Sequence, residues 1–234
     1  MRNGAAALGI HLSLAQMDLF RRYYEEIVAW NARVNLTSVI GWTEVHTRHF
    51  LDSLTVSLAI PQPILESGRF VDVGSGAGFP SVPLKIAFPG LRGILVEATA
   101  KKADFLVHVT DSLGLSEVEI CTGRAETLAR DPGLRERFDL ALARAVAKLD
   151  VLAELTLPFC RIGGIVVAQK ARDAAAEIAR AQRAIDIMGG ELAEVREISV
   201  QELGVTRTLV VLKKVSPTPE RYPRRPGMPA KRPL

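Results

Sequence analysis

The chain has 234 residues, of which 48% are hydrophobic and 24% charged, so it is long enough to fold as one domain around a sizeable core. Its formal net charge of +4 permits an anionic partner such as nucleic acid but does not require one. There is no run of about 18 apolar residues, and Cys121 and Cys160 are far apart, so we expect no membrane span, disulfide framework or zinc cluster.

The first 65 residues have helical patterns. Ser13 and Gln16 form a capping-box pattern ahead of apolar residues at helical spacing, and a second amphipathic stretch covers 43–60. Residues 1–65 are therefore predicted to form an N-terminal helical extension. The segment 5–15 faintly resembles a secretory signal, but His11 interrupts it and charged residues follow, so we expect a cytoplasmic protein.

From Arg69 onward, short apolar runs alternate with helical patterns, which predicts an α/β, doubly wound, mostly parallel sheet over 66–215. Two further strands lie close together near the end, with only a loop around Gly204 between them, so they should pair antiparallel. The strands are expected at 70–73, 93–96, 118–120, 140–142, 165–167, 192–199 and 208–212, and the helices near 80–88, 101–113, 148–158 and 172–188.

The last residues, 216–234, form a basic, proline-rich tail with Tyr222 among its arginines. Proline at this density favours an extended or disordered chain in isolation. We expect the tail to lie along an RNA backbone, and a merely solubilising tail is the alternative. On the first interpretation, truncation after Val215 weakens RNA binding and leaves cofactor binding unaltered.

A glycine-rich loop after the first predicted strand carries the chemistry. Gly74, Gly76 and Gly78 allow a sharp turn and a close approach of ligand to backbone, and we expect all three at the cofactor. A dinucleotide motif would place its third glycine at position 79, where this chain has Phe79. With Asp72 in the preceding strand, a carboxylate that a cationic sulfonium tolerates, the spacing favours S-adenosyl-L-methionine; a tight turn without ligand is the alternative.

The following strands add candidate cofactor residues. Glu97 ends the second strand, where an acid can accept the ribose hydroxyls, and Thr99 fits a helix N-cap. Residues 123–126 follow the third strand, where methyltransferases surround the adenine. Phe79 could pack against the cofactor or simply fill the core.

Two motifs that are typical of other methyl acceptors are missing at and after the fourth predicted strand. The segment 143–145 has no Asn/Asp-Pro-Pro-aromatic motif for an exocyclic amine, and Cys160 does not follow a proline as a carbon-5 nucleophile commonly does. The acceptor should therefore need little activation. Guanine N7 fits, because its lone pair attacks without prior loss of a proton.

Taken together, these motifs resemble those of the RsmG (GidB) family of small-subunit (16S) ribosomal RNA guanine-N7 methyltransferases. The resemblance spans nearly the whole chain. It rests on Trp30-Asn31, Asn35-Leu36-Thr37, Arg48-His49, Asp52-Ser53, the loop 72–80, Glu97-Ala98-Thr99, Lys101-Lys102, Arg124-Ala125-Glu126, Arg144-Ala145, Lys170, Arg207 and the tail 222–233.

This resemblance implies a site and partners. S-adenosyl-L-methionine would be contacted by Gly74, Phe79, Glu97, Ala98, Thr99, Ala125, Glu126 and Arg144, with Arg144, Lys170 and Arg207 at the catalytic face. Ribosomal RNA or the small ribosomal subunit would be the partner of a monomer that needs no metal. Family members often have Leu-Lys-Gly where this chain has Gln169-Lys170-Ala171, which weakens the case for the lysine.

Three alternatives stay open. One is a nicotinamide-dependent oxidoreductase, against which Phe79 argues, and another is a noncatalytic RNA-binding module with a methyltransferase fold. The third concerns His46, His49 and Asp52, whose spacing allows one shared helical face. We expect that face to be packed or hydrogen-bonded and not to hold a metal.

Overall fold

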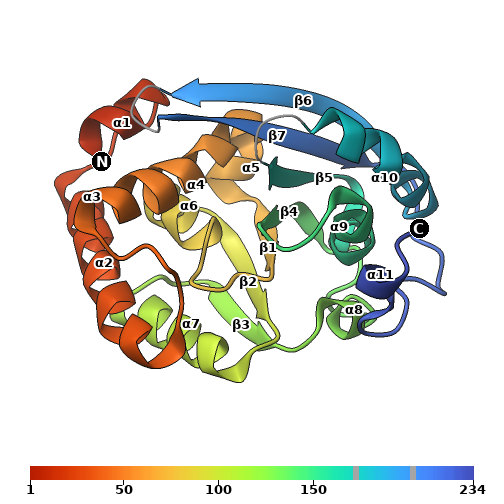
Figure 1. Ribbon diagram of the computed structural model, residues 1–234, viewed down its shortest axis with the longest axis horizontal. Coiled ribbons are helices and arrows are strands. Elements are labelled where there is room, and N and C mark those ends of the chain that lie inside the picture. Colours follow the sequence, from red (N-terminus) through yellow and green to blue (C-terminus); the bar gives the residue numbers. More distant parts are fainter. Residues whose placement is uncertain (171–173, 201–203) are drawn as a thin grey trace.

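The computed structural model describes residues 1–170, 174–200 and 204–234 and is built around one seven-stranded sheet with the order β3-β2-β1-β4-β5-β7-β6 (Figure 1). The first five strands pair in parallel, and β7 runs antiparallel to both of its neighbours. The strands are β1 Arg69–Val73, β2 Arg92–Glu97, β3 Val118–Thr122, β4 Phe138–Arg144, β5 Cys160–Lys170, β6 Gly190–Val200 and β7 Val205–Lys214. The predicted α/β fold with an antiparallel end is confirmed. The residues 201–203 of the predicted Gly204 loop lie outside the described residues.

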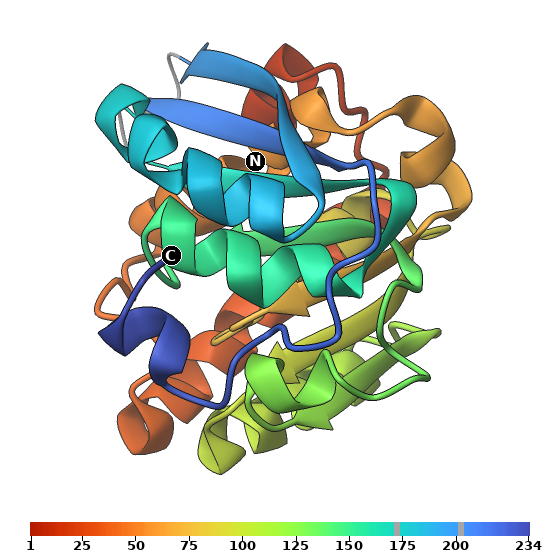
Figure 2. The same ribbon diagram turned by 90° about the vertical axis from the view of Figure 1, so that its right-hand side faces the viewer.

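Helices cover both faces of the sheet (Figures 1 and 2). One face is packed by α2, α4, α6 and α7, and the other by α8, α9 and α10. The longer helices are α2 Leu14–Val34, α6 Ser81–Ala87, α7 Ala100–Ser112, α9 Leu149–Thr156 and α10 Ala175–Ile187; the short ones are α1 Arg2–Ala7, α3 Trp42–Val45, α4 Asp52–Leu54, α5 Gln62–Ser67, α8 Ala125–Leu128 and α11 Met228–Lys231. Among the described residues, no helix is both long and apolar enough to cross a membrane.

The N-terminal helices agree with the sequence in part. The capping box is present, since Ser13 Oγ accepts from the Gln16 N–H and Gln16 Oε1 from the Ser13 N–H. The predicted stretch 43–60 is helical without a break from Trp42 to Ala59, but its hydrogen-bond pattern changes along the way, with a π-helical turn at His46–Leu51 and a 3₁₀ turn at Thr55–Ala59. A π-turn adds a residue and rotates the following side chains, which periodicity does not reveal.

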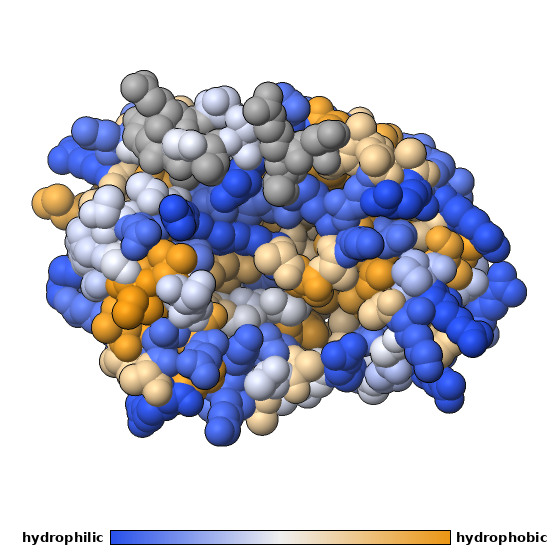
Figure 3. All heavy atoms as spheres, viewed as in Figure 1, coloured by the Kyte–Doolittle hydropathy of each residue, from blue (hydrophilic) through white to orange (hydrophobic). Residues whose placement is uncertain are grey.

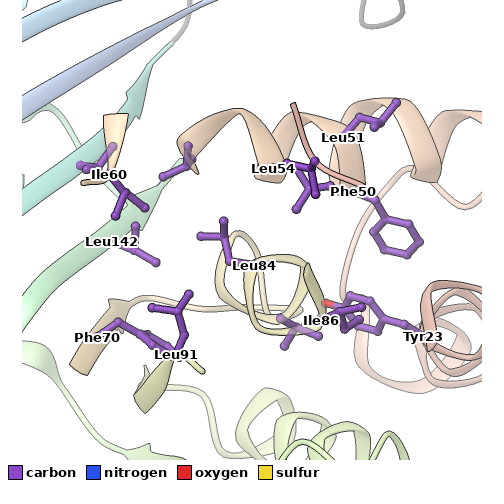
Figure 4. Close-up of a cluster of buried hydrophobic side chains, with 14 of the residues drawn as sticks. Tyr23, Phe50, Leu51, Leu54, Ile60, Phe70, Leu84, Ile86, Leu91 and Leu142 are labelled. Carbon is purple, nitrogen blue, oxygen red and sulfur yellow. The ribbon is translucent and has the colours of Figure 1, made fainter. Parts of the chain in front are cut away.

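The N-terminal helices are held by apolar packing. Phe50 and Tyr23 stack with ring centroids 5.1 Å apart, and both are fully buried. Figure 4 shows these rings beside Ile86 of α6, with Leu54 facing Leu84. This cluster joins the N-terminal segment to one face of the sheet. Each large apolar side chain that is fully buried stabilises the fold by about 1.5–3 kcal/mol.

Candidate active site

The glycine-rich loop leaves β1 at the carboxyl edge of the sheet, where ligands of open α/β sheets bind. Gly76 has a φ of +58°, and a Cβ there would meet only the Gly74 carbonyl oxygen, at 3.9 Å, so its outer side is open. Gly78 has a different role: a Cβ there would lie 2.6 Å from Val82 and 2.8 Å from the Tyr23 hydroxyl. Gly78 therefore serves close packing with α2 and α6, and it lines none of the cavities described below.

Glu97, at the end of β2, is oriented by backbone donors. Its Oε2 accepts from the Gly76 N–H at 2.9 Å and its Oε1 from the Thr99 N–H at 2.7 Å. Thr99 is the N-cap residue of α7 by position, but its side chain makes no capping bond. The carboxylate is therefore fixed beside the glycine loop, and its remaining lone pairs are available to a hydroxyl-bearing ligand.

A narrow slot lies beyond the loop, between the ends of β1, β2 and β3. It measures about 90 Å³ and is mostly apolar, with the Glu126 carboxylate as its acid; its lining is Val73, Gly74, Val96, Ala98, Gly123, Arg124, Ala125, Glu126, Val146 and Leu155. A slot of this kind suits a flat base with an exocyclic amine, since apolar walls cover the ring and a carboxylate accepts from the amine.

A wider cavity of about 330 Å³ opens on the other side of the glycine loop. The His49 ring stacks on Phe79 with centroids 4.6 Å apart, and the Arg144 guanidinium lies 5.6 Å from the same Phe79 ring. Burial, together with the charge of Arg144, lowers the pKa of His49 to about 4, so this imidazole is neutral at pH 7. The cavity is lined by Leu36, Thr37, His49, Gly74, Ser75, Gly76, Ala77, Phe79, Lys102, Arg144 and Ala145.

A third cavity, of about 360 Å³, adjoins the second because Arg144 and Ala145 line both. Its charged residues are Asp52, Arg144, Lys170 and Arg207, and Ala147 and Gln169 complete the lining. The molecular face seen in Figures 1 and 3 is hollowed near its middle, over the central strands, with hydrophilic side chains beside the hollow.

Asp52 organises the cations of the third cavity, although its carboxylate is only 1% exposed. Its Oδ1 accepts from Nε of Arg207 at 2.7 Å, and its Oδ2 lies 2.9 Å from Nη2 of Arg144 in an ion pair without hydrogen-bond geometry. Arg144 also donates to Ser53 Oγ at 3.2 Å and to the Arg48 carbonyl at 2.7 Å. The segment 48–53 thus holds Arg144 and Arg207 in place beside the cavity.

Lys170 has its own partners. Its Nζ donates to Glu177 at 2.6 Å and to the Ala147 carbonyl at 2.7 Å. Ala171, which differs from the family pattern, lies outside the described residues. The structure therefore brings the three predicted cations Arg144, Lys170 and Arg207 into one cavity, with two of them sharing one acid.

Asp72, the carboxylate in the strand before the loop, lies beneath the loop. Its side chain is fully buried beneath the loop, where Oδ2 accepts from Ser81 Oγ at 2.6 Å. Burial raises the pKa of this carboxyl to about 7, against the opposing hydrogen bonds from Ser81 and Ser75. The acid supports the start of α6 through Ser81.

The two cysteines are free. Cys160 is buried and donates to the Ile165 carbonyl, and burial raises the pKa of its thiol to about 12. Burial also raises the pKa of Cys121. Neither thiol is activated as a nucleophile, as the sequence analysis expected.

Sequence reasoning from spacing missed the part that His49 and Asp52 play in these cavities. Of the three residues with shared helical spacing, His46 packs against Trp42, whereas the other two reach the cavities. The segment Arg48-His49-x-x-Asp52-Ser53 was the available signal. No group of three potential metal-binding His, Cys, Asp or Glu side chains occurs within 1–170, 174–200 and 204–234.

The strand order, the glycine-rich loop after β1 and the acid ending β2 define a class I methyltransferase fold. Aeropyrum pernix fibrillarin with natively bound S-adenosyl-L-methionine superposes with a TM-score of 0.53 at 17% identity, covering 68% of this chain and 73% of that one. At this identity the likeness concerns the fold alone.

Sequence comparison identifies the family. The model of the GidB family, described as rRNA small subunit methyltransferase G, matches residues 16–208. Ribosomal RNA small subunit methyltransferase G of Dehalococcoides mccartyi is 48% identical over 231 residues, covering 99% of this chain and 97% of the relative. The protein of the same name from Roseiflexus sp. is 48% identical over 233 residues, with coverages of 99% and 97%. The chain therefore belongs to the rRNA small subunit methyltransferase G family.

Proposed function

We propose that this protein transfers a methyl group from S-adenosyl-L-methionine to N7 of a guanine in small-subunit (16S) ribosomal RNA. The observation that carries the proposal is the meeting of two cavities at Arg144 and Ala145, one beside the glycine loop and one lined by three cations. Family membership supports the reaction, since the relatives are named as small-subunit rRNA methyltransferases.

The residues present fit the cofactor. The apolar slot with Glu126 suits the adenine, and Glu97, held by two backbone N–H groups, suits the ribose hydroxyls. The remaining methionine part would extend past Gly76 towards Phe79 and Arg144. When bound, the cofactor supplies an electrophilic methyl group, which the N7 lone pair takes while the carbon–sulfur electron pair stays on sulfur.

The acceptor site is the cationic cavity. Arg144, Lys170 and Arg207 offer N–H donors to the acceptors of a guanine nucleotide, namely its phosphate oxygens and O6. Asp52 keeps Arg144 and Arg207 in place and is a positioning residue. Because N7 carries no proton, the chain needs no general base, and His49, neutral at pH 7, is not required to take one.

The chain contributes mainly orientation and exclusion of water. Phe79 lines the cavity beside the glycine loop, where its ring packs against the His49 ring and the Arg144 guanidinium. Positioning of two reactants can lower a barrier by about 7–11 kcal/mol in well-oriented systems. Ribosomal RNA, free or within the small subunit, would be the partner of a monomer, and the exposed arginines and lysine of 216–234 would contact phosphates.

The test is single-turnover methylation with methyl-labelled S-adenosyl-L-methionine, using small ribosomal subunits and naked 16S RNA as substrates. We expect 7-methylguanosine as the labelled nucleoside. Arg144→Ala should reduce the rate at saturating RNA and cofactor by about tenfold or more, the effect of one lost charged hydrogen bond.

Arg161→Ala is the matched control, because Arg161 pairs with Asp139 at the opposite end of the same strands. RNA binding without labelled product would favour the noncatalytic RNA-binding module. Thermal protection by a nicotinamide cofactor, with none from S-adenosyl-L-methionine, would favour the oxidoreductase. A label on any other atom would overturn the guanine N7 assignment.

A further inference from the structure

The C-terminal segment 216–234, called the tail here, is bound along the domain. Figure 2 shows it descending from the end of β7 across the face that carries α9 and α8 and ending at α11. Arg135 donates to the carbonyls of Thr218 at 2.7 Å and Tyr222 at 2.9 Å, and Arg130 donates to the Pro223 carbonyl at 2.7 Å. Proline has no backbone N–H, so a proline-rich segment cannot pair as a regular strand. Arginine side chains of the domain donate to the carbonyls of the tail instead.

A buried ion pair fixes the middle of the tail. Glu154 of α9 is 1% exposed, and it accepts from the Arg224 backbone N–H at 2.7 Å and from Nη2 of Arg224 at 2.6 Å. The Tyr222 ring beside it is buried in the core on this face of the sheet. The tail is thus anchored by a buried ion pair and a buried ring as well as by bonds to its carbonyls.

Beyond this anchor the tail reaches the predicted adenine slot. The Gly227 N–H donates to Oε1 of Glu126 at 2.8 Å, and Arg124 donates to the same oxygen at 3.1 Å. Burial raises the pKa of Glu126, but the hydrogen bonds from Gly227, Arg124 and the backbone of Glu126 itself, together with the charge of Arg124, outweigh burial, and the net shift is downward. Both bonds go to Oε1, and Glu126 lines the slot.

We propose that the tail completes the cofactor site: Gly227 holds the Glu126 carboxylate so that it accepts a hydrogen bond from the 6-amino group of adenine. Tail docking then controls selectivity for a 6-aminopurine nucleoside. The inference rests on the proposed function only in that the slot holds the base of the cofactor. It differs from the expectation that truncation of the tail leaves cofactor binding unaltered.

Two nucleosides test the proposal by calorimetry: adenosine, which has a 6-amino donor, and inosine, which has a 6-oxo acceptor in its place. Truncation after Pro226 removes Gly227 and keeps the Arg224–Glu154 anchor. It should weaken adenosine binding by about tenfold or more and leave inosine binding within about twofold. Truncation after Lys231, which keeps Gly227, is the matched control and should change neither.

Glu126→Gln provides a second route that does not shorten the chain. This substitution should also weaken adenosine binding more than inosine binding. Combining it with truncation after Pro226 should cause no further loss of adenosine affinity, because both changes act through one carboxylate. Unchanged adenosine affinity, equal losses for both nucleosides, or additive losses would overturn the role of the tail. If the full chain binds neither adenosine nor S-adenosyl-L-methionine, the proposed function falls together with it.

Discussion

The two segments that flank the sheet, residues 1–65 and the tail, are attached in opposite ways. The N-terminal segment buries aromatic and aliphatic side chains such as Phe20, Tyr23 and Phe50 in the core. The tail is attached largely through polar bonds, in which Arg130 and Arg135 reach its backbone carbonyls. Each nevertheless reaches the cavities: the N-terminal segment supplies Asp52 and His49 to their linings, and the Gly227 N–H of the tail bonds to Glu126, which lines the slot.

This difference predicts how each segment fails. Apolar packing is shared among many neighbours, so loss of one large side chain weakens the whole fold. Bonds from a single arginine to carbonyls are local, so their loss should release one segment while the remaining chain stays folded. The N-terminal segment should therefore unfold with the sheet, and the tail should detach alone.

The largest effect is expected for Phe50→Ala. The ring is fully buried and packs against Phe20, Tyr23 and Phe79, so its removal leaves a cavity and should lower the free energy of unfolding by about 3–5 kcal/mol. Urea denaturation measures the change. Leu14→Ala, at a side chain that is 83% exposed, is the control and should stay within about 0.5 kcal/mol of wild type. A small loss for Phe50→Ala would mean that the N-terminal segment folds apart from the sheet.

A smaller and local effect is expected for Arg135→Ala. The variant leaves the Thr218 and Tyr222 carbonyls without this donor, a loss of about 1.5–3 kcal/mol for bonds to a charged group. Trypsin should then cut after Arg221 and Arg224 about tenfold faster or more, with the urea midpoint nearly unchanged.

Arg137→Ala is its control, since Arg137 is exposed and its side chain makes one long bond, 3.4 Å, to the Pro132 carbonyl. If Arg135→Ala lowered the urea midpoint as Phe50→Ala does, the tail would belong to the same cooperative unit as the core, and the comparison would fail.

The same contrast explains what the sequence could predict. Periodic apolar residues identified α2 and the strands, and the glycine spacing located the cofactor loop, because these signals are local. The tail's docking depends on arginines some 80–90 residues away bonding to backbone carbonyls, which no side-chain pattern records. The contribution of Asp52 was hidden because its partners Arg144 and Arg207 lie about 90 and 155 residues further along the chain, and helical spacing does not record such contacts.

The smallest effect should come from pH and should again separate the two segments. The pKa of His49 is lowered to about 4 by burial and by the charge of Arg144. Between its ordinary value of about 6.5 and this value, the unfolded chain binds a proton that the folded chain does not. His49 therefore contributes stability that is present above about pH 6.5 and is lost as the pH falls towards 4.

His49→Gln isolates this contribution, since glutamine does not titrate and can still bond to Thr37, which lies 2.8 Å from the His49 ring. Asp72, with its pKa raised to about 7, has the opposite pH dependence, but both proteins retain it and the difference between them cancels it. Measured by urea unfolding at pH 7.5, 6 and 5, the excess stability of wild type over His49→Gln should shrink on acidification. The cost of Arg135→Ala in the trypsin assay should stay constant from pH 7.5 to 6, because the lost bonds go to backbone carbonyls, which are not ionisable. A wild-type excess that is flat or grows at low pH would mean that His49 is not held neutral against Phe79 in the cavity beside the glycine loop.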